Sequence, residues 1–338
     1  MDDIQKNHDE DLHRIPDESI APSLLSPKLP WLNVSPVLFA FIGLAVVFLL
    51  YQVVGGVISY ILFGANVTDD NVNLMRTISV IGQFLFMLIP SVLLARSQRW
   101  DLKKLFRIRM PGVWEVVLVV LAVAGLQIAL QVYLISQDYI LETFLMPTTL
   151  KPLIDQIKKM INELYTKLVF AHTPLELFYI IIVIGLTPAI CEEALFRGLV
   201  QGAFEKGMKV TKSIIFCGII FALFHLNPFA FVPLAILGIY FSFIVWKGTS
   251  IVLAAIAHFM NNSLAAISLY FLGTDAVIIP SQSGTDLSTP VLAANFIVGI
   301  SVFSLATFFF WKATEKRKER AMVLQKSLEE RDATHGVF

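Results

Sequence analysis

Long apolar segments alternate with short polar ones along most of the chain. The hydrocarbon core of a bilayer is about 30 Å thick, and an α-helix rises about 1.5 Å per residue, so one crossing needs about 20 apolar residues. Apolar segments of roughly this length lie at 36–63, 74–95, 113–135, 175–201, 213–226, 229–246, 250–272 and 291–311. The pattern therefore predicts an all-α protein, a polytopic transmembrane bundle of about eight helices.

The fifth and sixth segments are separated by a turn signal. The fifth segment is short, and Asn227-Pro228 stands between it and the sixth. Because proline disfavours helical backbone at the residue before it, the sequence predicts a tight hairpin between two helices. The alternative is that 213–246 forms one broken re-entrant unit.

A different periodicity lies at 151–170. Apolar residues recur there at helical spacing, and the opposite face is charged, as is typical of an amphipathic helix in the membrane interface. The apolar positions include Leu153, Ile157, Met160, Leu164 and Leu168, and the charged ones Asp155, Lys158, Lys159, Glu163 and Lys167. This helix could form a lateral wall or a substrate gate of a site, or it could merely cover the bundle.

The basic residues predict how the chain crosses the membrane. Lys and Arg are concentrated in the loops 96–109 and 202–212 and at 312–320, whereas 64–73 and 273–290 contain Asp but neither Lys nor Arg. By the positive-inside rule the basic loops and both termini lie in the cytoplasm, which an even number of crossings allows. In this topology the lysines of 151–170 lie on the non-cytoplasmic side of the membrane, which is against the positive-inside rule.

The chain is expected to consist of three parts. A polar cytoplasmic segment, 1–35, precedes a membrane-embedded domain, 36–311, and a charged cytoplasmic tail, 312–338, follows. The first 35 residues show no short apolar core before a small-residue cleavage site, so the first apolar segment is expected to remain as a signal anchor.

Composition agrees with a membrane protein. Hydrophobic residues make up 56% of the chain and charged residues 15%, and the mean hydropathy is +0.72. The 26 basic residues balance the 26 acidic ones, so no positive excess indicates a nucleic acid partner, and the lipid bilayer is the expected surrounding. Cys191 and Cys217 both lie in apolar segments, which argues against a disulfide framework or a CxxC metal motif.

Three short motifs place polar residues where lipid is expected. They are Glu192-Glu193-Ala-Leu-Phe-Arg197-Gly198, Phe221-Ala-Leu-Phe-His225 and His258-Phe-Met-Asn-Asn262. A charged side chain at the centre of a transmembrane helix costs about 2.5–3.5 kcal/mol on insertion scales. These side chains are therefore expected to face the interior of the bundle.

Spacing predicts how the charges of the first motif are arranged. Glu193 and Arg197 are four residues apart, which suits an ion pair within one helix. Glu192 points about 100° away and needs a partner from another helix. Counted at about 1.5 Å per residue from the nearest basic residue, Glu192 lies roughly 21 Å deep, His225 roughly 18–20 Å and His258 roughly 16 Å. Three helices thus place polar groups near one level.

Such a cluster could hydrolyse an amide bond. A carboxylate and an imidazole can deprotonate a water molecule, and a second imidazole with an amide can stabilise the oxyanion that forms. No GxSxG element indicates a nucleophilic serine, and the zinc motif HExxH is absent from the sequence. Glu192, His225 and His258 would nevertheless also suit zinc, so both mechanisms stay open here.

The three motifs, in this order on separate segments, resemble those of the CPBP intramembrane endopeptidases. This family comprises the type II CAAX prenyl proteases and bacteriocin-processing proteins, also called CPBP family metalloproteases. The resemblance covers 190–265, within a CPBP-like core expected at about 175–272. It implies that Glu192 is the general base together with His225, and that His258 and Asn262 stabilise the oxyanion. The residues that it implies as support are Glu193 and Arg197.

The resemblance also implies a substrate and a location. The substrate would be a membrane-associated protein or peptide, cleaved in CAAX-type or bacteriocin-type processing or in self-immunity. The reaction would be of the glutamate type and would require no cofactor, with zinc as the alternative. The compact loops suit a multi-pass protein of a bacterial plasma membrane.

Two other classes of function fit some of the same residues. In a transporter or proton relay, Glu192 and His225 would exchange protons, but matched broken helices in two halves are then expected, and the sequence shows one break, near Pro228. A non-catalytic scaffold would keep the fold without using the site, and Glu193 with Arg197 would then be a purely structural ion pair.

Overall fold

The protein is helical throughout the part that the structure describes. The computed structural model describes residues 34–64, 67–145, 147, 149–273 and 289–335. All described helices belong to one compact unit, which begins at Ser35. The predicted N-terminal segment 1–35 lies almost entirely outside the described residues, as does most of the acidic loop 273–290.

The predicted polytopic helical bundle is confirmed. Within the described ranges, seven helical stretches are long and apolar enough to cross a membrane, and α12 (Val210–Phe224) is a shorter apolar helix. The seven stretches are Pro36–Phe63, Val72–Ser97, Val113–Phe144, Pro174–Gly207, Pro228–Gly248, Ile251–Leu272 and Thr289–Arg317. Each of the eight apolar segments predicted from the sequence is therefore a helix.

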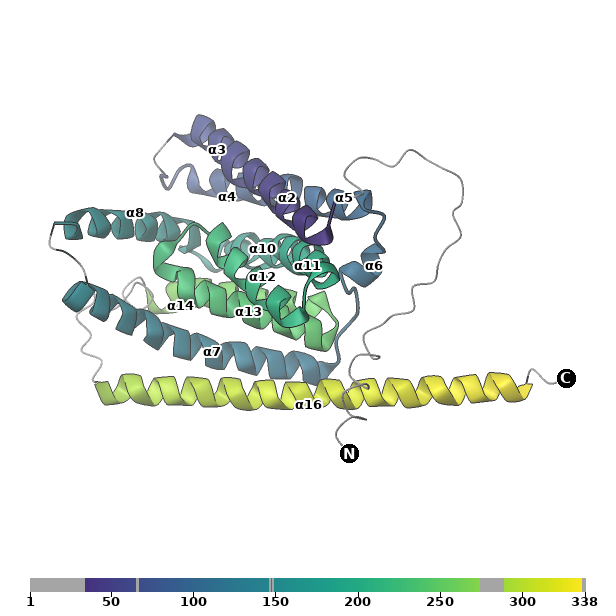
Figure 1. The fold of residues 1–338 in the computed structure, drawn as a ribbon. Coiled ribbons are helices and arrows are strands. Elements are labelled where there is room, and N and C mark those ends of the chain that lie inside the picture. The colour runs from purple at the N-terminus through teal and green to yellow at the C-terminus, as the bar shows by residue number, and fades with distance from the viewer. Residues whose placement is uncertain (1–33, 65–66, 146, 148, 274–288, 336–338) are drawn as a thin grey trace. The chain divides into compact units, whose positions relative to one another are not determined.

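Four of the long stretches combine α-helical parts (Figure 1) with π-helical parts, which are written with the prefix η; η7, in contrast, is a 3₁₀-helix. The first consists of α2 (Pro36–Phe48), η2 (Leu49–Val54) and α3 (Gly55–Phe63), and the second of α4 (Val72–Gln83), η3 (Phe84–Leu88) and α5 (Ile89–Ser97). The third consists of α7 (Val113–Ile140) and η4 (Leu141–Leu145). The fourth consists of α9 (Pro174–Ile180), η5 (Ile181–Leu186), α10 (Thr187–Glu193), η6 (Ala194–Val200) and α11 (Gln201–Gly207). The remaining helices are α6 (Leu102–Leu105), α8 (Lys151–Val169), η7 (Pro228–Ala230), α13 (Phe231–Gly248), α14 (Ile251–Leu272) and α16 (Thr289–His335).

Two helices extend well beyond the predicted apolar segments. The third stretch continues past residue 135 to Leu145, because the polar Asp138 is buried and pairs with Lys158 of α8, with 3.0 Å between Oδ1 and Nζ. The last helix, α16, continues through the charged region as far as His335, where no glycine or proline interrupts it. Most of the charged tail is therefore helical.

The predicted hairpin joins α12 to α13. The side chain of Asn227 accepts hydrogen bonds from the amides of Phe229 (3.1 Å) and Ala230 (3.3 Å), which starts the short η7 turn after Pro228. The two helices then pack closely, because Gly218 and Gly238 face each other: a Cβ on Gly238 would lie 2.9 Å from the Cα of Gly218. The close packing holds the end of α12 against α13.

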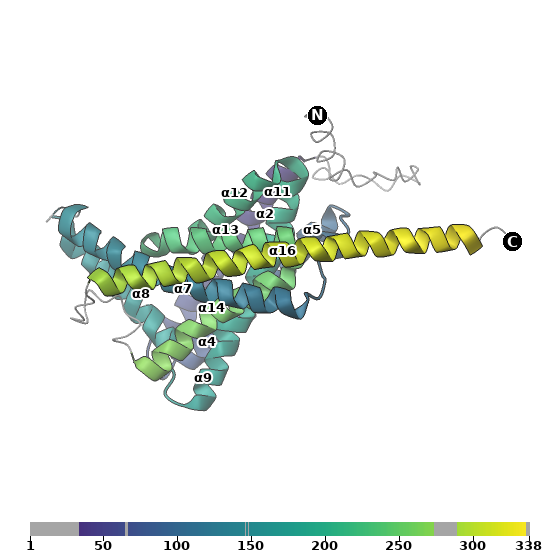
Figure 2. The same cartoon turned by 90° about the horizontal axis from the view of Figure 1, so that it is seen from below.

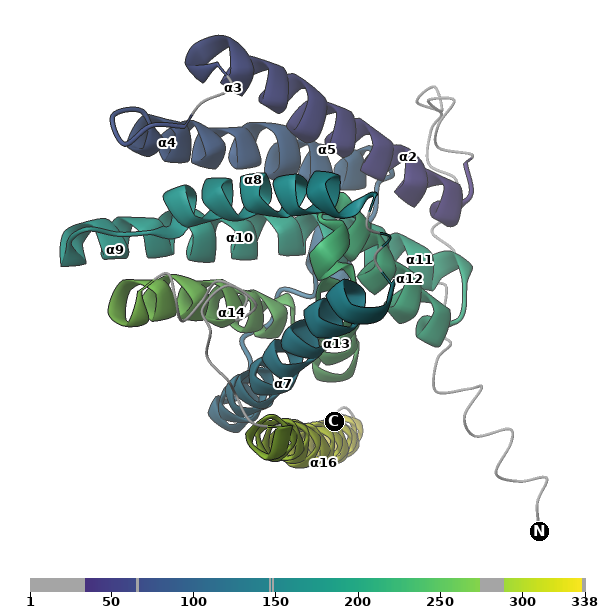
Figure 3. The same ribbon diagram turned by 90° about the vertical axis from the view of Figure 1, so that its left-hand side faces the viewer.

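The fourth stretch occupies the centre of the described bundle. Figure 3 shows α10 between α4 and α5 on one side and α14 on the other. On the far side of α14, α7 and α16 lie side by side (Figures 1 and 2) and meet at Gly125 and Gly299. The main apolar core lies among α7, α13, α14 and α16. Every motif that breaks the apolar pattern is on the fourth stretch or on a helix packed against it.

The basic loops meet at one end of the bundle. Arg107 pairs with Glu205, Lys206 lies 5.6 Å from the ring centre of Trp100, and Nη2 of Arg109 donates to the carbonyl of Gly248 at 2.7 Å. Arg317 of α16 also donates to that carbonyl (3.2 Å). Loops that are distant in sequence thus share one end, as the positive-inside rule requires, and the cytoplasmic location of that end stays a prediction.

The amphipathic segment forms α8, within one residue of its predicted bounds. Its C-terminal end is fastened by Arg76 of α4, which is 1% exposed and donates to the carbonyls of Leu168 (2.9 Å), Lys167 (2.9 Å) and Phe170 (2.8 Å). Arg76 also pairs with Glu176 of α9 at 2.6 Å. Apolar side chains of α8 remain exposed, as expected for a helix in the membrane interface, and this location stays a prediction.

Candidate active site

The polar motifs meet at the centre of the fourth stretch. Glu192 and Glu193 are the last two residues of α10, and Arg197 lies in the π-helical η6 that follows. His225 comes directly after α12, and His258 lies in α14. Both helices pack against the fourth stretch, so one side chain from each reaches the same place. The segment η6 is π-helical, and π-helical turns are frequent at functional sites.

Glu192 lies between the two histidines. Its Oε2 is 3.7 Å from Nε2 of His225 and 3.9 Å from Nε2 of His258. The side chains of Glu192, His225 and His258 are 14%, 28% and 3% exposed, so His258 is buried, while Glu192 and His225 are partly exposed, although Oε2 of Glu192 itself is buried. The convergence of these three groups from three helices agrees with the equal depths estimated from the sequence, whereas their chemical roles stay a prediction.

The hydrogen bonds of His225 fix its tautomer. Its Nδ1 lies 2.7 Å from the carbonyl oxygen of Phe221, which can only accept, so Nδ1 donates the proton. In the neutral ring Nε2 then carries a lone pair, and it is this atom that faces Glu192. The Phe221 ring packs against the imidazole, with 4.6 Å between ring centres. His225 is therefore oriented by the residue that opens its own motif.

His258 is oriented by Glu193. Its Nδ1 lies 2.8 Å from Oε1 of Glu193, and the same oxygen accepts from Nη1 of Arg197 at 2.9 Å. The predicted ion pair between Glu193 and Arg197 is thus present, and both side chains are almost completely buried. The contact between Glu193 and His258 was not predicted from the sequence. It connects the ion pair to the histidine that faces Glu192.

Arg197 is enclosed by aromatic rings as well as by its ion pair. Its guanidinium carbon lies 4.6 Å from the ring centre of Phe221 and 5.3 Å from that of Phe241. Nη2 donates to the carbonyl of Gly238 at 3.0 Å, which ties η6 to α13. Phe221 therefore contacts both Arg197 and His225, in line with the packing role that its side chain type suggests.

Asn262 lies one turn beyond His258 on α14, but its contacts are different. Its Nδ2 donates to the carbonyl of Ile184 in η5 at 2.8 Å, and its Oδ1 accepts from Asn261 at 3.0 Å. Asn261 in turn accepts from Gln127 of α7. One of the two Nδ2 protons of Asn262 therefore already makes a hydrogen bond to the backbone. The role predicted for Asn262, donation to the oxyanion, depends on the second Nδ2 proton.

The residue types suit a metal, but their placement does not. In both histidines Nδ1 contacts a carbonyl or a carboxylate and Nε2 faces Glu192, and zinc-binding histidines use their second ring nitrogen in the same way. Among the described residues, however, no three His, Cys, Asp or Glu side chains are grouped so that they could hold a metal ion. The set Glu192, His225 and His258 is therefore not assembled as a zinc site in this arrangement.

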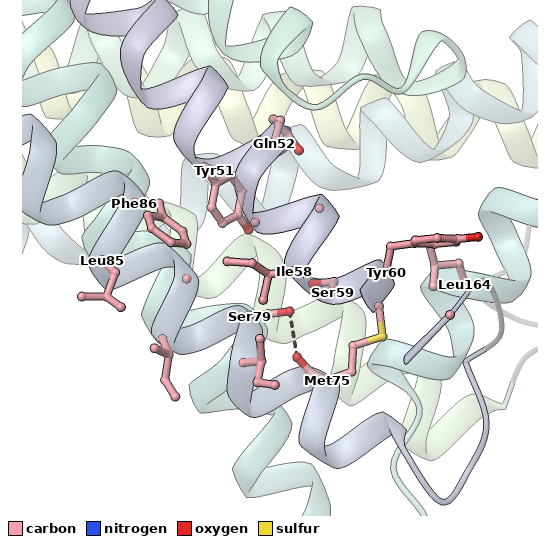
Figure 4. A pocket seen from close by; sticks show the side chains of 16 residues that line it. Tyr51, Gln52, Ile58, Ser59, Tyr60, Met75, Ser79, Leu85, Phe86 and Leu164 are labelled. Carbon is pink, nitrogen blue, oxygen red and sulfur yellow. Dashed lines mark hydrogen bonds between the residues drawn. The ribbon is translucent and has the colours of Figure 1, made fainter. Parts of the chain in front are cut away.

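A cavity of about 550 Å³ lies beside the cluster, between the first and second stretches (Figure 4). Tyr51 and Gln52 line it, and Nε2 of Gln52 donates to the carbonyl of Phe224 at 2.9 Å, directly before His225. Tyr51 stacks on Phe224, with 6.5 Å between ring centres. Two residues of the cavity wall thus contact Phe224, the residue that precedes His225.

The sequence alone does not predict this cavity. Its walls carry small residues such as Gly55, Gly56 and Gly82 and have no charged side chain. The signal available in the sequence is Gln52, a polar residue in the middle of the apolar segment 36–63 and close to Gly55-Gly56. A gap between helices depends on how they pack, and no single segment encodes it.

Comparison with known proteins assigns the region that carries the cluster. Residues 174–264 match the family model described as type II CAAX prenyl endopeptidase Rce1-like. This match contains Glu192, Glu193, Arg197, His225, His258 and Asn262. It confirms the resemblance to the CPBP endopeptidases. No curated protein and no solved structure matches the chain.

Proposed function

We propose that this integral membrane protein, whose residues 174–264 match the family model of type II CAAX prenyl endopeptidases, hydrolyses a peptide bond with a water molecule activated by Glu192. The observation that carries the proposal is the position of Oε2 of Glu192, 3.7 and 3.9 Å from the Nε2 atoms of His225 and His258. This oxygen is buried and has no hydrogen-bond partner among the described residues.

Glu192 and His225 would act on the water. A water molecule held between Oε2 of Glu192 and Nε2 of His225 gives a proton to the carboxylate as its oxygen attacks the peptide carbonyl. The protonated Glu192 then returns the proton to the leaving amine, so the carboxylate is regenerated. Because Nδ1 of His225 already donates to Phe221, its Nε2 is available to orient the water.

His258 and Asn262 would stabilise the tetrahedral intermediate. A doubly protonated His258 would donate from Nε2 to the oxyanion, while Nδ1 donates to Glu193; the oxyanion and the Glu193 carboxylate together would balance the charges of His258 and Arg197. Asn262 supplies its second Nδ2 proton. Arg197 holds Glu193 in place, so both members of that pair act on the reaction through His258. Hydrogen bonds of this kind are stronger in a site that excludes most water.

Chelation distinguishes the two versions of the mechanism. Since the cluster is not arranged as a metal site, we expect cleavage by the purified protein to be unchanged after exhaustive dialysis against a strong chelator. Activity is measured on a membrane-anchored peptide before and after dialysis, and a zinc peptidase in the same buffer serves as a positive control. Loss of cleavage on chelation with recovery on adding zinc would establish the zinc version instead.

The cavity beside Tyr51 offers a route for substrate from the bilayer. We expect Gly56→Phe to lower kcat/KM for a membrane-anchored substrate by about tenfold, equivalent to about 1.4 kcal/mol, because the ring would fill part of the cavity. A Cβ on Gly56 meets no atom within 4 Å, so the fold tolerates the change. Cleavage assays on the purified variant test this.

Val57→Phe is the matched control for this substitution. Val57 is the next residue, is 53% exposed and does not line the cavity, so its replacement should leave kcat/KM unchanged. Equal rates for Gly56→Phe and the wild type would exclude the cavity as the route.

The substrate is proposed to be a membrane-associated protein or peptide. The family match favours CAAX-type processing, and bacteriocin-type processing or self-immunity is the second candidate within the same chemistry. We place the protein in a bacterial plasma membrane with both termini in the cytoplasm. Comparison of membrane proteomes from cells with the wild type and with Glu192→Gln should reveal precursors that remain uncut only in the variant. An identical set of processed proteins would contradict the proposed function.

A further inference from the structure

A second cavity, of about 740 Å³, lies between the N-terminal end of α7 and the middle of α16. It is formed by helices outside the proposed catalytic cluster, at the end of the bundle where the basic loops meet. Its lining divides into two parts. One is apolar and aromatic, and the other carries three basic side chains against one carboxylate.

The apolar part of the cavity is open to the surroundings. Val113 and Trp114 are 78% and 73% exposed, and Phe309 on α16 is 54% exposed. Leu118 continues this wall along α7 toward the interior of the predicted crossing. Exposed tryptophan at the end of a transmembrane helix is typical of the level of the lipid headgroups. The cavity therefore extends from headgroup level along the apolar surface of α7.

The carboxylate in the lining is already neutralised. Oε2 of Glu115 accepts from Nη2 of Arg109 (2.8 Å) and from the amide of Gly112 (2.9 Å), and Oε1 accepts from Arg317. Glu115 is 4% exposed, so its charge is neutralised by these partners inside the protein. It therefore leaves the remaining basic side chains of the cavity without a carboxylate to balance them.

Lys312 and Lys316 provide this positive charge. They are four residues apart on α16, so they project from the same face of the helix, and both are exposed. Within the described part of the chain neither amine forms an ion pair, and Glu315, which attracts Lys312 at longer range, is itself paired with Lys247 at 3.2 Å. Nζ of Lys312 lies 5.9 Å from the ring centre of Phe308. Two ammonium groups thus stand beside an apolar wall.

We infer that this cavity binds an anionic glycerophospholipid, with its phosphate at Lys312 and Lys316 and an acyl chain along Trp114 and Phe309. Basic pockets between transmembrane helices at the headgroup level suit anionic headgroups, because the ammonium groups pair with phosphate while the apolar wall receives the chain. A soluble anion would use the lysines but not the apolar wall. The combination of both parts favours a lipid, and it does not depend on the proposed peptidase activity.

The test uses the full chain, purified and reconstituted in nanodiscs of phosphatidylcholine with or without phosphatidylglycerol. Native mass spectrometry should show phosphatidylglycerol retained in preference to phosphatidylcholine. The double variant Lys312→Gln/Lys316→Gln should bind phosphatidylglycerol about twenty- to thirtyfold more weakly, the factor that corresponds to about 1 kcal/mol for each lysine.

Lys103→Gln/Lys104→Gln is the matched control, because these two exposed lysines of α6 lie in a basic loop at the same end but not in the cavity. Equal weakening by both double variants would overturn the proposal in favour of diffuse attraction. Equal retention of the two lipids by the wild type would also overturn it. Displacement of the lipid by inorganic phosphate at a similar concentration would show that a soluble anion is the ligand.

Discussion

Glu192→Gln is expected to abolish peptide-bond hydrolysis while the protein remains folded and inserted. The amide has nearly the shape of the carboxylate but cannot take a proton from the attacking water. Loss of a general base typically costs about 10²–10⁴-fold in rate, and we expect a loss at the upper end because the same group also returns the proton. Among the described residues no Lys or Arg pairs with this carboxylate, so its loss should leave the packing intact.

The measurement is cleavage of a membrane-anchored CAAX-type reporter by the purified variant, together with its thermal unfolding temperature. Glu163→Gln on α8 is the matched control, because Glu163 is 62% exposed and lies outside the cluster. His225→Ala should also abolish cleavage, since it removes the second group that faces the water. Cleavage retained by purified Glu192→Gln would remove the role assigned to it. If proton flux rather than cleavage depended on Glu192, the protein would be a proton relay.

The hydropathy of the chain predicts the crossings well because burial in lipid acts on each segment separately. It fails where a polar residue is satisfied by another helix. The third segment was predicted to end near residue 135, yet the helix continues to Leu145, since Lys158 of α8 neutralises the buried Asp138. A partner so distant in sequence cannot be recognised from the pattern of one segment.

The sequence predicts how deep in the membrane each residue of the site lies, but not in which direction its side chain points around the helix axis. Residue counts place Glu192, His225 and His258 at one level, and the structure brings them together. Which nitrogen of His258 faces which carboxylate depends on how α10 and α14 are turned, so its contact with Glu193 was not predicted. The same applies to Asn262, whose partner is the backbone carbonyl of Ile184, a group that the residue type does not reveal.

Arg197→Met is expected to destabilise the protein strongly. The side chain is 0% exposed, and its removal leaves Glu193, itself 1% exposed, without the cation that it pairs with at 2.9 Å. Breaking one side of a buried ion pair costs about 3–5 kcal/mol, because the remaining charge stays buried. The carbonyl of Gly238 also loses its donor. Thermal unfolding in detergent, followed by tryptophan fluorescence, should show a clear fall in the midpoint, with cleavage activity lost as His258 is released.

A second substitution separates stability from chemistry at this pair. Glu193→Gln combined with Arg197→Met removes both charges, so the double variant should unfold at a higher temperature than Arg197→Met alone. Its activity should not recover, because Nδ1 of His258 then lacks a carboxylate. Lys159→Met is the exposed control: its pair with Glu163 is 3.8 Å long and its side chain 72% exposed, so the midpoint should hardly move. Wild-type stability in Arg197→Met would show that the ion pair does not hold the fold. Recovered activity in the double variant would show that Glu193 does not position His258.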